Sequence, residues 1–129
     1  MKRAFAVMVL ALTAALAVAA EYPTKPVRII TPFPPGGSVD FIARLLANDL
    51  AKPLGQQIVV DNRTGASGII GTEIAKNAAP DGYTLLVNTL PFATSQFVYD
   101  KMPYDPINDF AAVSLLCSVA SWWRIPRFR

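Results

Sequence analysis

The spacing of apolar residues changes several times along the chain, and these changes predict alternating strands and helices. Short apolar-rich runs predict three strands and a further, fourth strand: 27–30, 58–60, 83–87 and 110–116. The second run, Ile-Val-Val, is expected to be buried. Between the first three runs, apolar positions at helical spacing predict one helix from Ser38 to the break at Pro53 and another over 69–78. This order predicts an α/β fold with a parallel-rich sheet flanked by helices and right-handed crossovers.

Two glycine-containing loops are expected at the carboxyl edge of this sheet. The first, at 32–37, reads Pro-Phe-Pro-Pro-Gly-Gly; its prolines withhold amide donors and its glycines permit positive φ, so it interrupts both kinds of regular structure. The second loop covers 61–68. Each loop precedes a helix whose first amides lack intrahelical partners and could receive an anion, and Ser38 is the expected N-cap of the first helix. The local sequence is equally compatible with two tight turns that hold no ligand.

Two charged residues beside these loops have alternative interpretations. Asp40 falls in the first turn of the first helix, where the helix dipole alone favours a carboxylate, and it also lies next to the expected anion site. Arg63 could pair with a ligand carboxylate in bidentate fashion, or with Asp61 or Asp40. The sequence leaves both alternatives open.

The N-terminus has the pattern of a secretory signal peptide. Lys2 and Arg3 give a positive start, residues 4–20 form an uncharged run rich in Ala, Val and Leu, and the run ends in Ala-Val-Ala-Ala just before Glu21. A membrane-spanning anchor usually needs about 20 apolar residues with stronger hydrophobes than Ala, so cleavage is favoured over an uncleaved anchor or a buried helix. Residues 1–20 are therefore expected to direct export and to be removed.

The positive net charge of +3 belongs to the two ends of the chain. Five of the twelve basic residues lie there: Lys2, Arg3, Arg124, Arg127 and Arg129. Residues 21–123 carry seven basic and nine acidic side chains. Because nucleic-acid binding needs Lys and Arg clustered on one face, no nucleic-acid partner is expected.

The composition also opposes catalysis and metal binding. The chain has no His, which excludes Ser-His-Asp and Cys-His groupings and His-containing zinc sites, and its one cysteine, Cys117, excludes an intramolecular disulfide or a CxxC motif. The glycines of 65–71 are spaced GxxGxxG, whereas a dinucleotide-binding loop has GxGxxG. A hydrolase nucleophile elbow around Ser67 would need glycine at position 69, where this chain has Ile69. No catalytic residue, metal or cofactor is expected. A small nucleotide- or acyl-handling α/β domain is the enzyme alternative.

Several motifs occur in an order and spacing that together are highly specific. They are Pro-Phe-x-Pro-Gly-Gly-x-x-Asp at 32–40, Leu-Gly-Gln at 54–56, Asn-Arg-x-Gly-Ala-x-Gly at 62–68, Pro-Asp-Gly-Tyr-Thr-Leu at 80–85 and Pro-Tyr-Asp-Pro-x-x-Asp-Phe at 103–110. From Tyr22 to about Leu116 the chain resembles the start of Bug-type substrate-binding proteins, the extracytoplasmic receptors of tripartite tricarboxylate transporters.

The resemblance implies a two-lobed periplasmic binding protein of type II-like fold, of which residues 21–116 would form a partial, incomplete first lobe. It implies a periplasmic location, a small organic anion as ligand (a carboxylate) and membrane permease subunits as partners. A receptor that presents its ligand to a sensor kinase is an alternative within the binding class.

The resemblance also implies which residues form the first lobe's share of the ligand cleft. Those carried over from the two loops, with one residue after the third strand, are Phe33, Pro34, Gly36, Gly37, Ser38, Asp40, Asn62, Gly65, Ala66, Ser67, Gly68 and Thr89.

The final segment, residues 117–129, departs from the family pattern. It contains Trp122 and Trp123 and three arginines within its last eight residues, a sharp change in composition. We expect an aberrant tail on a truncated gene product, with half a ligand cleft.

Overall fold

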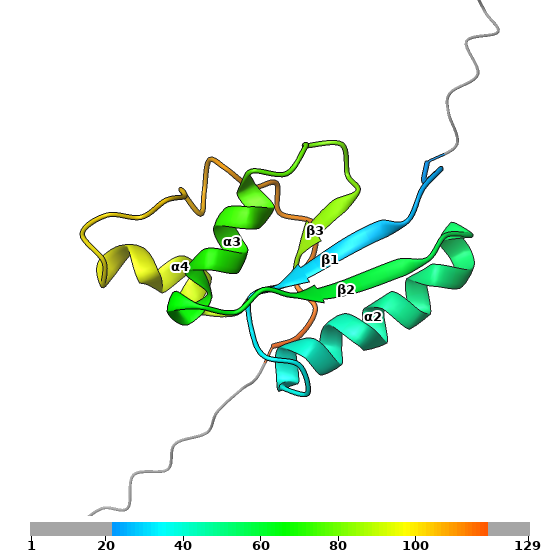
Figure 1. Cartoon of the computed structure of the whole chain (residues 1–129), viewed down its shortest axis with the longest axis horizontal. Coiled ribbons are helices and arrows are strands. Elements are labelled where there is room, and N and C mark those ends of the chain that lie inside the picture. Colours follow the sequence, from blue (N-terminus) through cyan, green and yellow to red (C-terminus); the bar gives the residue numbers. More distant parts are fainter. Residues whose placement is uncertain (1–21, 119–129) are drawn as a thin grey trace, which may run out of the picture.

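The computed structural model describes residues 22–118, and the expected signal peptide and most of the expected tail lie outside these residues. Within them the chain forms three strands and a series of helices and turns (Figure 1). In chain order these are β1 (Val27–Thr31), α2 (Ser38–Leu54), β2 (Ile58–Asn62), the 3-10 turn η1 (Ala66–Gly68), α3 (Ile69–Lys76), β3 (Thr84–Leu86), α4 (Pro91–Thr94) and η2 (Ser95–Phe97).

The three strands form one parallel sheet in the order β2-β1-β3. This confirms the predicted parallel α/β fold. The first crossover runs from β1 to β2, and the second runs in the opposite direction, from β2 past β1 to β3, so right-handed connections place α2 and α3 on different sides of the sheet (Figure 1). α2 packs against β1 and β2, and α3 packs against β1 and β3.

The burial of each strand follows its place in the sheet. Val27, Ile29 and Ile30 of the central strand β1 are fully buried, and Ile29 belongs to a core cluster with the α2 face. The prediction that 58–60 is a buried strand is wrong in part, because β2 lies at the sheet edge and Val59 remains 43% exposed.

The first helix begins one residue earlier than the capping prediction requires. Gly37 is the N-cap of α2 and Ser38 is its first helical residue, with no side-chain capping hydrogen bond. The second helix is shorter than predicted: α3 ends at Lys76, where the Asn77 amide closes the last turn on the Glu73 carbonyl at 3.0 Å.

The predicted fourth strand at 110–116 is absent from the described part of the chain. Residues 111–118 are exposed and form neither a helix nor a strand, and Val113 and Leu115 are more than four-fifths exposed. A β-strand needs a hydrogen-bonding neighbour, and here none pairs with this run. Over residues 22–118, no helix combines the length and apolarity needed to cross a bilayer.

Candidate functional site

The sheet brings both glycine-containing loops to one edge. Thr31 ends β1 and Asn62 ends β2, and the two residues are register partners in the parallel pair. The loops that follow, 32–37 and 63–68, therefore leave the sheet side by side, and the segment after β3 starts from the same edge. The predicted convergence of the two loops is confirmed.

Asp40 hydrogen-bonds to the backbone of the first loop, 32–37. Its side chain is almost fully buried, and Oδ2 accepts hydrogen bonds from the Gly36 amide and from Arg44 Nε, both at 2.8 Å. Oδ1 accepts a third from Asn62 Nδ2 at 2.9 Å. The hydrogen bond from Arg44, with those from Gly36 and Asn62, holds the pKa of the Asp40 carboxyl far below its ordinary value.

Asn62 joins the end of β2 to the first loop. Its Nδ2 donates to the Phe33 carbonyl at 3.1 Å and to Thr31 Oγ1 at 3.3 Å, besides Asp40. Its Oδ1 accepts from Arg44 Nη2 at 3.3 Å. The amide therefore contacts both the start of the 32–37 loop and the helix that follows it.

The second loop runs through a series of left-handed backbone conformations. φ is +134° at Gly65, +45° at Ala66, +54° at Ser67 and +94° at Gly68. Positive φ is uncommon for residues with a side chain, and such strained conformations cluster at functional sites. The exposed Ala66 and Ser67 form the outermost part of this turn.

A glycine that the sequence analysis missed sets the spacing between the loops. A Cβ on Gly71 would lie 2.4 Å from the Arg63 carbonyl oxygen and 2.9 Å from Pro32, so only glycine fits there. The signal was available, because Gly71 is the last glycine of the GxxGxxG series.

Hydrogen bonds connect the segment after β3 to the second loop, through polar residues that the sequence analysis also missed. Asn88 Nδ2 donates to Thr72 Oγ1 at 2.9 Å, and Thr72 Oγ1 donates to the Gly68 carbonyl at 2.7 Å. Thr72 is fully buried. The bond between the Asn88 and Thr72 side chains spans 16 residues and has no periodic sequence pattern, which is why it could not be predicted.

The implied ligand residues divide into an exposed group and an engaged group, apart from Gly65, which is half-buried. Pro34, Gly36, Gly37, Ser38, Ala66 and Ser67 are exposed at the loop tips, and Thr89 is exposed after β3. Asp40 and Asn62 are occupied by contacts within the protein, Phe33 packs against the core cluster, and Gly68 is buried. Of the alternatives for Arg63, the structure shows the pair with Asp61, at 3.0 Å.

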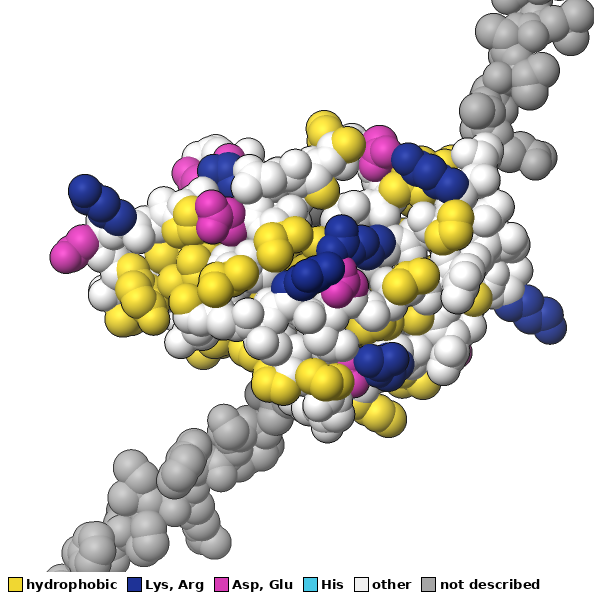
Figure 2. Space-filling model, in the orientation of Figure 1, with side chains coloured by type: hydrophobic (Ala, Val, Ile, Leu, Met, Phe, Trp, Pro, Cys, Tyr) yellow, Lys and Arg dark blue, Asp and Glu magenta, His cyan; other side chains and the backbone are white. Residues whose placement is uncertain are grey.

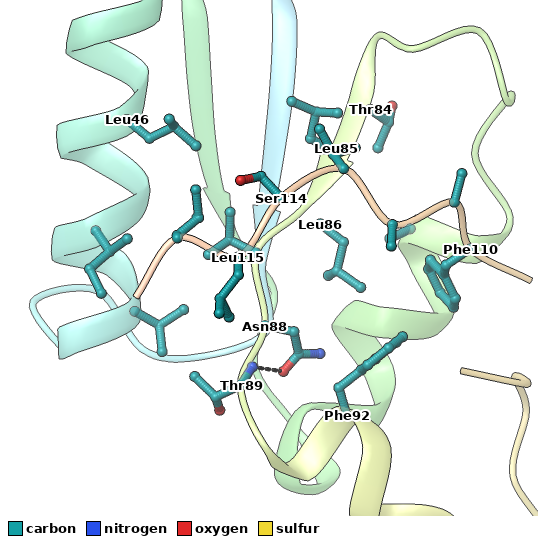
Figure 3. A pocket seen from close by; sticks show the side chains of 18 of the residues that line it. Leu46, Thr84, Leu85, Leu86, Asn88, Thr89, Phe92, Phe110, Ser114 and Leu115 are labelled. Atoms are coloured by element: carbon teal, nitrogen blue, oxygen red, sulfur yellow. Dashed lines mark hydrogen bonds between the residues drawn. The ribbon is translucent and has the colours of Figure 1, made fainter. Parts of the chain in front are cut away.

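A separate cavity of about 1340 Å³ lies between α2, β3 and the 109–117 segment (Figure 3). Leu46 of α2 and Leu85 of β3 face it, and the segment carrying Ser114 and Leu115 crosses over it. Its lining is mainly apolar, and among its charged groups Lys76 and Asp109 form an ion pair with each other at 2.9 Å. Burying a carboxylate against apolar groups is costly, so the loop edge suits an anion better. Of the implied site residues, Ser38 and Thr89 border this cavity.

Charge is spread across the visible face of the molecule. Figure 2 shows basic side chains next to acidic ones, with hydrophobic side chains gathered towards the α4 end. Leu90, Phe97 and Val98 are each at least 74% exposed in this part of the chain.

Comparison with known proteins gives a consistent match. Residues 42–123 match the family described as "Tripartite tricarboxylate transporter family receptor". The chain is 45% identical over 100 residues to Protein BugT of Bordetella pertussis, covering 76% of this chain and 31% of BugT.

Solved structures show the same fold. The periplasmic binding protein BugD superposes with a TM-score of 0.67 at 40% identity, covering 69% of this chain and 30% of BugD. MatC from Rhodopseudomonas palustris, solved with bound malate, gives a TM-score of 0.65 at 36% identity, covering 74% of this chain and 33% of MatC. The chain thus spans about a third of the length of the relatives that it matches.

Proposed function

Since this chain belongs to the tripartite tricarboxylate transporter receptor family, we propose that it binds a small carboxylate at the loop edge of its sheet. The matched relatives are receptors and binding proteins, which supports binding without turnover and opposes the enzyme alternative. MatC holds malate, a small dicarboxylate, and this supports the same ligand class here.

One observation carries the proposal: two loops lie side by side at one edge of the sheet, and each leads into the N-terminus of a helix. Register places the ends of β1 and β2 together, and the loop tips at 34–38 and 66–67 remain exposed to solvent. The first amides of α2 lack intrahelical partners, whereas the Ile69 amide at the start of α3 donates to the Ala66 carbonyl. The positive ends of both helix dipoles favour an anion at this edge. No other group of the described residues offers this combination.

The proposed ligand contacts come from the two loops and the end of β3. They are expected at Phe33, Pro34, Gly36, Gly37, Ser38, Gly65, Ala66, Ser67 and Gly68, with Thr89 at the end of β3. Asp40 and Asn62 are expected to act from behind the loops, because their polar atoms are already bonded within the protein.

Export to the periplasm and delivery of the ligand to membrane permease subunits are part of the same proposal. They rest on the signal-peptide pattern of residues 1–20 and on the family.

Isothermal calorimetry with the 129-residue chain tests the binding proposal. Malate should bind, and malamide, which has the same shape without the charges, should bind at least about tenfold more weakly because the site recognises charge. Equal affinity for the two compounds, or no heat with malate and related dicarboxylates, would overturn the proposal.

A further inference from the structure

Arg44, on the exposed side of α2, connects two residues that belong to different parts of the chain. Its guanidinium donates from Nε to Asp40 Oδ2 at 2.8 Å and from Nη2 to Asn62 Oδ1 at 3.3 Å. Asn62 Nδ2 in turn donates to Asp40 Oδ1 at 2.9 Å. The three side chains therefore close a ring in which each contacts the other two.

Two further hydrogen bonds connect this ring to the first loop. Asp40 Oδ2 accepts from the Gly36 amide at 2.8 Å, and Asn62 Nδ2 donates to the Phe33 carbonyl at 3.1 Å. The loop is thus fastened near both of its ends. Asn62 is also the last residue of β2, directly ahead of the second loop.

We propose that Arg44 is a positioning residue that, through Asp40 and Asn62, fixes the first ligand loop to the end of β2, directly ahead of the second loop. It does not touch the ligand. Its fork supplies donors to two acceptors at once, which fixes Asp40 and Asn62 relative to each other. A lysine ammonium is a compact point charge and does not reproduce the planar fork. The loop amides are then already in place when an anion arrives, so binding does not have to order them.

The charge of Arg44 has a second consequence at this edge. The Asp40 carboxylate is buried just behind loops that are proposed to receive an anion, and a like charge nearby would repel that anion. The ion pair with Arg44 offsets this charge. This part of the inference rests on the proposed function, whereas the fastening of the loop does not.

Three variants of the full 129-residue chain separate these effects. Arg44→Met removes the fork and the charge but keeps the apolar stem, and Arg44→Lys keeps the stem and the charge but not the fork. Lys52→Met is the matched control, since it removes a basic charge from the last turn of the same helix. Amide hydrogen exchange at Gly36 reports the loop without any ligand, and malate calorimetry reports binding.

We expect Gly36 exchange to become roughly fivefold faster in Arg44→Met, in keeping with an ion pair in which the Arg44 side chain is half-exposed, while the amides of β1 stay protected. Malate affinity should fall by a similar factor. Arg44→Lys should restore part of the affinity but little of the Gly36 protection. Lys52→Met should change neither measurement.

The two readouts keep this inference distinct from the proposed function. Unchanged Gly36 exchange in Arg44→Met would overturn the positioning role even if malate binds well. Faster exchange at Gly36 with no malate binding in any form, including the unsubstituted chain, would support the ring and overturn the proposed function. Uniformly faster exchange across β1 and Gly36 would show a general loss of stability and would also overturn the positioning role.

Discussion

Thr31 and Asn62 face each other as register partners at the ends of β1 and β2, and Asn62 Nδ2 donates to Thr31 Oγ1 at 3.3 Å. Thr31 is fully buried. This is the last register pair of β1 and β2, at the point where both loops leave the sheet. A polar pair is stable there because each member also contacts the Phe33 carbonyl, so the buried polar atoms are satisfied.

Removing the Asn62 amide should destabilise this edge. Asn62→Ala removes the donor from Thr31 Oγ1 and from Asp40 Oδ1, and one of the two donors from the Phe33 carbonyl, and an unsatisfied buried group costs about 1–3 kcal/mol. Chemical denaturation should show a loss in this range. Asn48→Ala is the control, because Asn48 is exposed on α2 and Ala is the better helix former, so its stability should be equal or slightly higher. Equal stability of both variants would contradict the role of Asn62.

The stability of the protein should depend on Asp40 in acid. The folded-state pKa of this carboxyl is lowered by the hydrogen bonds from Arg44, Gly36 and Asn62. A lowered pKa contributes stability that is present above the unfolded value, about 3.9, and is lost as pH falls from there towards the folded pKa. Asp40→Asn should therefore show a shallower loss of unfolding free energy below about pH 4 than the unsubstituted chain. Parallel pH profiles for the two chains would refute this.

Gly71 should not tolerate a side chain. In Gly71→Ala the new Cβ would meet the Arg63 carbonyl oxygen and Pro32, both of which are backbone or ring atoms with little freedom to move. Overpacking of this kind costs about 1–3 kcal/mol. Thermal unfolding should show a lower midpoint, and full retention of the midpoint would mean that α3 can shift away from the first loop.

The order of elements could be predicted from the sequence, because β1 and β2 are short apolar-rich runs and α2 and α3 have apolar residues at helical spacing, and because Pro32 and Gly55 directly follow β1 and α2. The edge position of β2 could not, since the period of a strand does not say how many neighbours it has. The prediction of a strand at 110–116 was wrong for the same reason: the run is apolar, but no strand of the described chain pairs with it.

At the site, the two loops could be predicted because glycine and proline mark them. The ring of Asp40, Asn62 and Arg44 could not be predicted, because Asn62 on β2 lies 18 residues from Arg44 and 22 from Asp40 and meets them only when α2 packs against β2. Asp40 at the start of a helix is equally well explained by the helix dipole, and only its contacts show that it fastens a loop.

Export is tested at the N-terminus. If residues 1–20 are a cleaved signal, the protein recovered from the periplasm should begin at or near Glu21, because the small residues before it permit cleavage. N-terminal sequencing of that fraction is the measurement. Intact Met1 in the membrane fraction would instead indicate an uncleaved anchor.

Two substitutions at Ser67 separate the backbone from the side chain in the second loop. Ser67 has φ of +54°, which glycine adopts freely and which proline, fixed near −65°, does not. Ser67→Pro also removes the amide donor, and losing a hydrogen bond to a charged group costs about 1.5–3 kcal/mol, or a tenfold or greater loss of malate affinity. Ser67→Gly removes only the hydroxyl and keeps the amide and the loop conformation, so it should weaken malate binding far less. Calorimetry on both variants decides between them. If Ser67→Gly loses as much affinity as Ser67→Pro, the hydroxyl is the main contact; if neither loses affinity, this loop is a tight turn without a ligand.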